Sequence, residues 1–145
     1  MATEESAPMH GACLCGAVKF ELTPPSLFCG HCHCSMCRRN HGAAYVTWLV
    51  AEKAQLNILQ GEDLLTVYQS SSKGQRAFCG KCGSTLFCEI YERPNEVDIP
   101  LANMDGPVDL DPQFHVFSDD AVSWSCPADD LPRLGGETGQ EPLDG

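Results

Sequence analysis

Ten cysteines are the most informative residues of this sequence, because most of them lie in three short clusters. The clusters are residues 13–16 (CLCG), residues 31–37 (HCHCSMC) and residues 79–83 (CGKCG). Cysteines with one or two residues between them hold their sulfurs close enough to share one metal ion, whereas the cysteines of a disulfide framework are spread along the chain. The spacing therefore favours metal-binding thiolates over disulfides.

The beginning of the chain also favours reduced thiols. The sequence MATEESAPMHGAC has neither the basic start nor the apolar core of a secretory signal. Since free thiols and metal sites are typical of the cytoplasm, we expect a cytoplasmic protein. A mature secreted chain whose signal has been removed is the alternative.

Two of the cysteine pairs could complete one closed zinc site. Cys79 and Cys82 lie on a predicted tight turn whose glycines permit positive φ, so that backbone N–H groups can point at the sulfurs. A tetrahedral structural site needs four ligands, and Cys13 and Cys15 are the natural complementary pair. We predict a structural zinc ion on these four residues, joining the N-terminal strand to the middle of the domain. Four unligated buried cysteines are the alternative.

The middle cluster predicts a different kind of site. Cys32, Cys34 and Cys37 provide three thiolates within six residues. Three protein ligands with an open fourth position are typical of a catalytic zinc. The alternative is a second closed site with His31, His33 or Cys29 as the fourth ligand. His33 is the weaker candidate, since in an extended segment it points opposite to its two cysteine neighbours.

Length, charge and composition exclude several classes of protein. A chain of 145 residues is about the size of one domain. Its net charge of −11 argues against a nucleic-acid binder, which needs a basic stripe. Its longest uncharged apolar run, residues 43–51, is far shorter than a membrane-spanning helix. With 43% hydrophobic residues the chain is not a disordered tail.

Short strands are the elements that must position these cysteines. Alternating apolar and polar residues or β-rich composition predict strands near residues 18–22, 43–50, 55–58, 64–69, 84–91, 97–101 and 114–117. One helical turn is predicted at residues 35–40. The fold class is therefore mainly β, in a single domain over residues 10–134. We expect residues 1–9 and the acidic tail 135–145 to be disordered.

Four segments carry a resemblance to a known family. They are GACLCGAVKFEL (11–22), CHCSMCRRNHG (32–42), LTVYQSSSKGQRAFCGKCGSTLF (65–87) and a tail PQFHVF…W…DDLPRL (112–134). In content, order and spacing they resemble the glutathione-dependent formaldehyde-activating enzymes, a family that also includes centromere protein V. The resemblance implies a zinc-containing β-tent, similar to the Mss4-like fold.

The resemblance also implies metals and an activity. It places a structural zinc on Cys13, Cys15, Cys79 and Cys82 and a catalytic zinc on Cys32, Cys34 and Cys37, so that two Zn²⁺ ions are expected per chain. The activity implied is that of a carbon–sulfur lyase, which joins glutathione and formaldehyde reversibly to S-(hydroxymethyl)glutathione. A small-molecule thiol such as glutathione is the expected partner, and neither nucleic acid nor a membrane is expected.

Two functional hypotheses follow from the middle cluster. In the first, an enzyme binds a substrate thiol at an open zinc. Arg38, Arg39 and Arg76 flank the cysteine clusters and could hold substrate carboxylates, and His33 or His41 could relay protons. Arg38 and Arg39 could equally be a solvated pair or partners of acidic residues in the tail. In the second hypothesis, a non-catalytic, zinc-stabilised binding module has a closed site with His31 or Cys29 as fourth ligand.

Three cysteines remain outside the seven expected ligands. Cys88 lies in an apolar β-rich run, where packing is its expected role. Cys29 could be a spare thiol beside the metal, and Cys126 has no role that its neighbours indicate. The oligomeric state is left open by the sequence.

Overall fold

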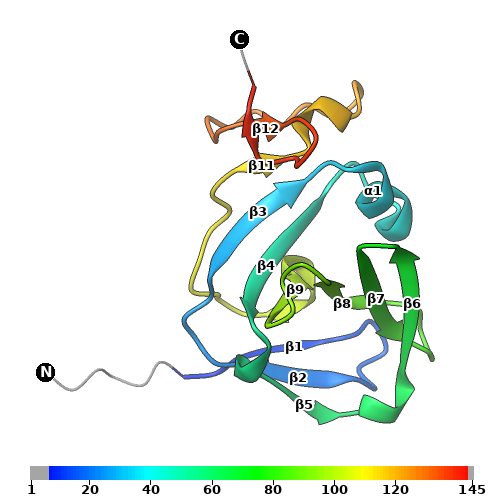
Figure 1. Cartoon of the computed structure of the whole chain (residues 1–145). Coiled ribbons are helices and arrows are strands. Elements are labelled where there is room, and N and C mark those ends of the chain that lie inside the picture. The colour runs from blue at the N-terminus through cyan, green and yellow to red at the C-terminus, as the bar shows by residue number, and fades with distance from the viewer. Residues whose placement is uncertain (1–6, 144–145) are drawn as a thin grey trace, which may run out of the picture.

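The computed structural model describes residues 7–143, which form mainly β-structure, as predicted (Figure 1). The strands are β1 (Met9–Ala12), β2 (Lys19–Leu22), β3 (Phe28–Cys32), β4 (Val46–Glu52), β5 (Leu56–Gln60), β6 (Leu65–Ser71), β7 (Gly74–Cys79), β8 (Thr85–Ile90), β9 (Glu96–Pro100), β10 (Met104–Asp105), β11 (His115–Val116), β12 (Leu134–Gly135) and β13 (Glu141–Pro142). The helical elements are α1 (Ser35–His41) and the 3-10 turns η1 (Lys53–Gln55), η2 (Glu62–Leu64), η3 (Leu101–Asn103) and η4 (Ser118–Asp120).

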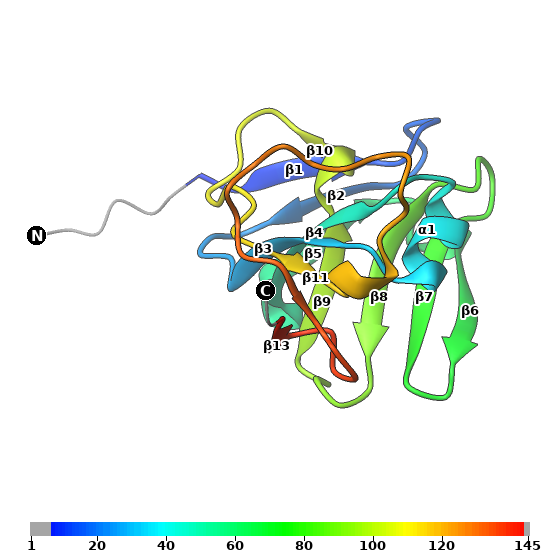
Figure 2. The same ribbon diagram turned by 90° about the horizontal axis from the view of Figure 1, so that it is seen from above.

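Two sheets make the body of the fold. The smaller sheet has the strand order β10-β1-β2-β5, and the larger has the order β11-β3-β4-β9-β8-β7-β6. Neighbouring strands are antiparallel, except that β11 runs parallel to β3. In Figure 1 strands β1, β2 and β5 of the smaller sheet lie below β3 and β4 of the larger one, and Figure 2 shows β6 to β9 side by side. The two sheets thus enclose the main core between them.

The alternating pattern of β2 places its apolar side chains in that core. Phe20 and Leu22 are fully buried, whereas Lys19 is exposed. The Phe20 ring meets Phe87 of the larger sheet edge to face, with 5.2 Å between the ring centroids. Its cross-strand partner is Gly11, where a Cβ would collide with the ring. A glycine in β1 is therefore what gives the phenyl ring its space.

The helix α1 begins at one of the clustered cysteines. The sulfur of Cys34 caps the helix by accepting the backbone N–H of Cys37 at 3.3 Å. The helix ends at Gly42, which has φ of 60°. Cysteines 34 and 37 are thus held one turn apart, as the predicted helical turn at residues 35–40 required.

The structure differs from the sequence-based expectation in several strands. Strands β1, β3 and β7 were not among those predicted, because β3 (FCGHC) and β7 (GQRAFC) contain glycine, cysteine and buried polar residues instead of a clear alternation. Strand β4 begins at Val46 and not at residue 43. The reason is that the left-handed Gly42, directly before residue 43, still belongs to the end of α1.

Residues near both ends of the chain, where we predict disorder, take part in backbone pairs in the structure. Met9 is buried and pairs with Leu22 in the sheet. At the other end, β12 pairs with β13, and Gly139 accepts the backbone N–H of Phe117 at 2.9 Å. These backbone pairs order residues 9 and 135–143, whereas residues 1–6 and 144–145 lie outside the described part of the chain.

No helix among residues 7–143 is long and apolar enough to cross a membrane.

Truncating Phe20 tests the packing between the sheets. We expect Phe20→Ala to lower the free energy of unfolding by about 3–5 kcal/mol, the usual cost of removing a buried phenyl ring. The control Tyr68→Ala removes a side chain that is 62% exposed and should change it by no more than about 0.5 kcal/mol. Urea denaturation of the zinc-loaded variants measures both free energies of unfolding. An equal loss of stability in the two variants would contradict the described core.

Candidate metal centres

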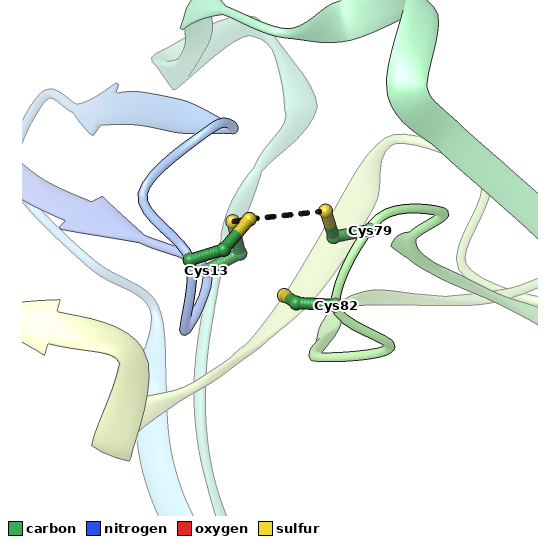
Figure 3. Close-up of side chains that lie close together, drawn as sticks. Cys13, Cys79 and Cys82 are labelled. Atoms are coloured by element: carbon green, nitrogen blue, oxygen red, sulfur yellow. Dashed lines mark hydrogen bonds between the residues drawn. The ribbon is translucent and has the colours of Figure 1, made fainter.

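Four cysteines from two distant turns converge at one point between the sheets. Cys13 and Cys15 lie on the turn between β1 and β2, Cys79 ends β7, and Cys82 lies on the turn that follows it. Figure 3 shows Cys13 facing Cys79 and Cys82 across the gap between these turns. The Sγ atoms of Cys13 and Cys15 are 3.6 Å apart, and those of Cys15 and Cys79 are 3.9 Å apart.

These distances fit a tetrahedral zinc ion. Zn–S bonds of about 2.3 Å place the ligand sulfurs about 3.8 Å from one another. All four sulfurs lie within 4.8 Å of each other, so little movement is needed to close on an ion. The four residues can therefore form a closed, all-thiolate site of the structural kind.

The surrounding backbone stabilises thiolates at this position. The N–H of Val18 donates to Cys13 Sγ at 3.3 Å, and the N–H of Leu14 donates to Ser84 Oγ, which lies 3.5 Å from Cys82 Sγ. The hydroxyl of Ser84 lowers the pKa of the Cys82 thiol to about 5. Donors aimed at ligand sulfurs are the usual outer partners of a zinc–thiolate site.

The second group consists of Cys32, Cys34 and Cys37, whose sulfurs lie within 4.8 Å of one another. Cys32 ends β3, Cys34 caps α1 and Cys37 lies inside it. Cys32 and Cys37 are buried, whereas Cys34 is half-buried. The group packs against an apolar cluster that includes Trp48. It can hold one metal ion through three thiolates.

A buried arginine faces this second group. Arg76, on β7, is 5% exposed, and its Nη2 donates to Cys37 Sγ at 3.5 Å. Hydrogen bonds from Cys32 and Cys34, and then the charge of Arg76, lower the pKa of the Cys37 thiol. Three thiolates and a divalent ion carry a net charge of −1, which the guanidinium can balance. Arg76 was expected at a substrate carboxylate, whereas in the structure it contacts a ligand sulfur.

The residues considered as a fourth ligand lie elsewhere. Within residues 7–143, no further His, Cys, Asp or Glu ligand atom joins the Cys32–Cys34–Cys37 group. His31 Nδ1 lies 2.7 Å from Thr47 Oγ1, and His33 Nε2 lies 2.8 Å from His115 Nδ1. Cys29 is fully buried in the core between the sheets, where burial raises the pKa of its thiol to about 11. In the described part of the chain the group therefore has three protein ligands.

The other expected site residues lie around α1 or away from it. Arg38 donates its Nε–H to His33 O at 3.2 Å, and Arg39 is exposed on the same helix. Cys88 is buried beside the second group, and burial raises the pKa of its thiol to about 12. Cys126 is exposed in the C-terminal segment.

Sequence reasoning missed the ligand-facing role of Arg76, and it assigned none to His115 and Asp129. These two residues form a third group with His31. Arg76 was visible in the sequence three residues before Cys79, but only the three-dimensional structure reveals that it reaches Cys37 on α1.

Serine substitutions should separate the two cysteine groups. Coupled zinc binding and folding is worth about 10–16 kcal/mol in small zinc domains, as much as the whole stability of many domains. We therefore expect Cys79→Ser to unfold the protein, and Cys34→Ser to leave it folded with one zinc ion fewer. The control Cys126→Ser should keep both ions. Metal analysis and circular dichroism measure these outcomes, and equal destabilisation by Cys79→Ser and Cys34→Ser would contradict the division.

The sequence is similar to those of known proteins. The chain is 26% identical over 123 residues to a Halomonas elongata protein provisionally named a glutathione-dependent formaldehyde-activating enzyme, covering 80% of this chain and 78% of that protein. It is 33% identical over 80 residues to an uncharacterized lyase of Schizosaccharomyces pombe, covering 54% of this chain and 55% of the lyase.

A solved structure and a family model extend the comparison. A crystal structure of a Rhodobacter sphaeroides protein superposes with a TM-score of 0.59 at 29% identity, covering 70% of this chain and 92% of that one. The model of the family described as glutathione-dependent formaldehyde-activating enzyme matches residues 8–120. The chain belongs to this family.

Proposed function

We propose that this protein is a zinc-dependent carbon–sulfur lyase that joins a thiol, of the kind of glutathione, reversibly to formaldehyde. One observation carries the proposal: among residues 7–143, the Cys32–Cys34–Cys37 group has no fourth protein ligand. Three ligands and a free position are the pattern of a catalytic zinc. Membership of the family and the lyase named among the relatives support the reaction class.

The reaction needs a thiolate and a proton carrier. A zinc ion bound by the three cysteines would supply a fourth position that favours the ionised form of a thiol. In the forward direction the sulfur attacks the carbonyl carbon, a C–S bond forms, and the π electron pair moves to oxygen. The oxygen then takes up the proton that the thiol has lost. The reverse reaction breaks the same C–S bond at the same site.

Arg38 and Arg39 are the proposed binding groups for the substrate carboxylates. Both follow Cys37 directly on α1, and Arg39 is exposed to solvent. Guanidinium groups bind carboxylates through paired hydrogen bonds. We assign Arg76 a different part, since it is buried against Cys37: it balances the charge of the three thiolates.

His41 is the better placed of the two histidines considered for proton transfer. Each of the two has one buried ring nitrogen without a hydrogen-bond partner among the described residues, Nδ1 of His33 and Nε2 of His41, but the other nitrogen of His33 is engaged with His115. His41 lines an open hollow of about 460 Å³ together with Tyr45, Thr47 and Asn103. Its ring also contacts Trp48, which packs with Cys37. We therefore propose that His41 carries the proton between the thiol and the carbonyl oxygen.

Exchange spectroscopy tests the activity directly. In a mixture of glutathione, formaldehyde and their adduct, the zinc-loaded protein should raise the NMR exchange rate above the spontaneous rate. Cys34→Ser should return the rate to the background while the four-cysteine site keeps its zinc, and Cys126→Ser should leave it unchanged. A protein with both sites filled that gives no acceleration is a zinc-stabilised binding module and not an enzyme.

Arg38 and Arg39 should strengthen the binding only of thiols that carry carboxylates. A surface ion pair is worth about 0.2–1 kcal/mol, so changing both Arg38 and Arg39 to Ala should weaken glutathione binding by about 2- to 30-fold. Binding of 2-mercaptoethanol, which has no carboxylate, should stay the same. Calorimetry of both thiols with both proteins measures this. Unchanged glutathione affinity in the double variant would mean that the arginines are surface residues.

A further inference from the structure

We propose that His31, His115 and Asp129 form a third metal site, for a divalent transition-metal ion such as Zn²⁺. One potential ligand atom from each of the three lies within 4.8 Å of the others. The inference concerns a site separate from both cysteine groups and does not rest on the proposed function.

Strand pairing brings the two histidines together. His31 on β3 and His115 on β11 are direct partners in the parallel pair, so their side chains leave the sheet on the same face. The two rings stack with 4.7 Å between their centroids and 30° between their planes. Successive residues of a strand point to opposite faces, so His31 points away from the side of β3 on which Cys32 lies.

Each histidine has one ring nitrogen already held by a neighbour. His31 Nδ1 lies 2.7 Å from Thr47 Oγ1, and His115 Nδ1 lies 2.8 Å from His33 Nε2. Metal-binding histidines typically use one nitrogen as the ligand while the other donates to a nearby acceptor, which fixes the tautomer and the ring. Nε2 of each ring is then the ligand nitrogen, and that of His115 already faces the carboxylate of Asp129, the third proposed ligand.

Asp129 completes the group. Both its carboxylate oxygens lie 3.0 Å from His115 Nε2. Its Oδ1 also accepts from the backbone N–H of Leu131 and from Arg133, at 3.0 and 2.8 Å. Ligands about 2.0–2.1 Å from a tetrahedral zinc are about 3.3–3.4 Å apart, so a small outward shift of the carboxylate makes room for the ion. Oδ2 is then the oxygen that faces it.

The ligand set and its exposure indicate the kind of ion. Two imidazoles and one carboxylate suit Zn²⁺ and other first-row divalent ions, whereas they do not suit Ca²⁺ or Mg²⁺. His115 is 1% exposed, while the Asp129 side chain is 37% exposed, so the ion can enter from the carboxylate side and keep water ligands there. The nearby Arg133 guanidinium opposes a cation, and we therefore expect weaker binding than at the thiolate sites.

The ion would have a structural consequence. His115 and Asp129 belong to the C-terminal segment, whereas His31 precedes Cys32 directly. In Figure 1 β11 and β12 lie together at the end of β3. Metal binding would therefore fasten the C-terminal segment to the strand that carries a ligand of the second cysteine group.

The same side chains can instead form a metal-free chain of hydrogen bonds. In that arrangement His115 carries a proton on Nε2 and donates it to Asp129, and its Nδ1 accepts from His33. Metal binding needs the opposite tautomer of His115, with the proton on Nδ1. Imidazole ¹⁵N NMR distinguishes the two tautomers.

Zinc titration of the protein with both cysteine sites filled tests the proposal. We expect a third equivalent by calorimetry and metal analysis, together with shifts of the His31 and His115 Nε2 resonances. The exposed His10 should not respond. Asp129→Asn, which keeps the size of the side chain, and His115→Ala should each lose the third equivalent, whereas His10→Ala should keep it.

Removing the positive charge of Arg133 should strengthen metal binding, whereas the two ligand substitutions should abolish it. Arg133→Gln should tighten binding of the third ion by about 1.5- to 5-fold, the value of one surface charge pair. Saturation at two equivalents with the Nε2 proton of His115 retained would overturn the proposal. So would a third equivalent that persists in both Asp129→Asn and His115→Ala.

Discussion

The convergence of four cysteine sulfurs on two turns is the constraint on which the rest of the structure depends. Cys15 and Cys79 are 64 residues apart in the sequence, yet their sulfurs lie within 3.9 Å. One turn belongs to the smaller sheet and the other to the larger, so a shared ion would join the two sheets at one end of their common core. Cys13 and Cys79 are themselves part of that core, so a bound metal ion would stabilise the same contact as the apolar packing.

Strand β7 connects this constraint to the second cysteine group. Cys79 lies at its end, and Arg76, three residues earlier, reaches Cys37 on α1. The guanidinium also lies over the Trp48 ring, at 5.8 Å from its centroid. Fixing the end of β7 thus fixes the position of the charge beside the three-cysteine group. One strand thus connects the four-cysteine group, proposed as the closed site, with the three-cysteine group, proposed as the open one.

Local features were predictable from the sequence and long-range ones were not. The pairs Cys13/Cys15 and Cys79/Cys82 were recognisable from their spacing, and a helical turn was predicted at residues 35–40, where the structure has α1. His115 reaches His31 and His33 through the parallel β11–β3 pair, across 82 residues in the case of His33, and Asp129 joins them through its contact with His115. The order at residues 135–143 likewise comes from backbone contacts to Phe117 that composition does not reveal.

Cadmium-113 NMR tests the central claim, that one cysteine group is closed and the other open. With both groups loaded, we expect two resonances. The one from the four-cysteine group should not respond to added glutathione, because its four sulfurs leave no free position. The one from the Cys32–Cys34–Cys37 group should shift as the thiol takes the fourth position. Two resonances that both stay unshifted with glutathione, or a single resonance with both groups intact, would contradict the assignment of one closed and one open group.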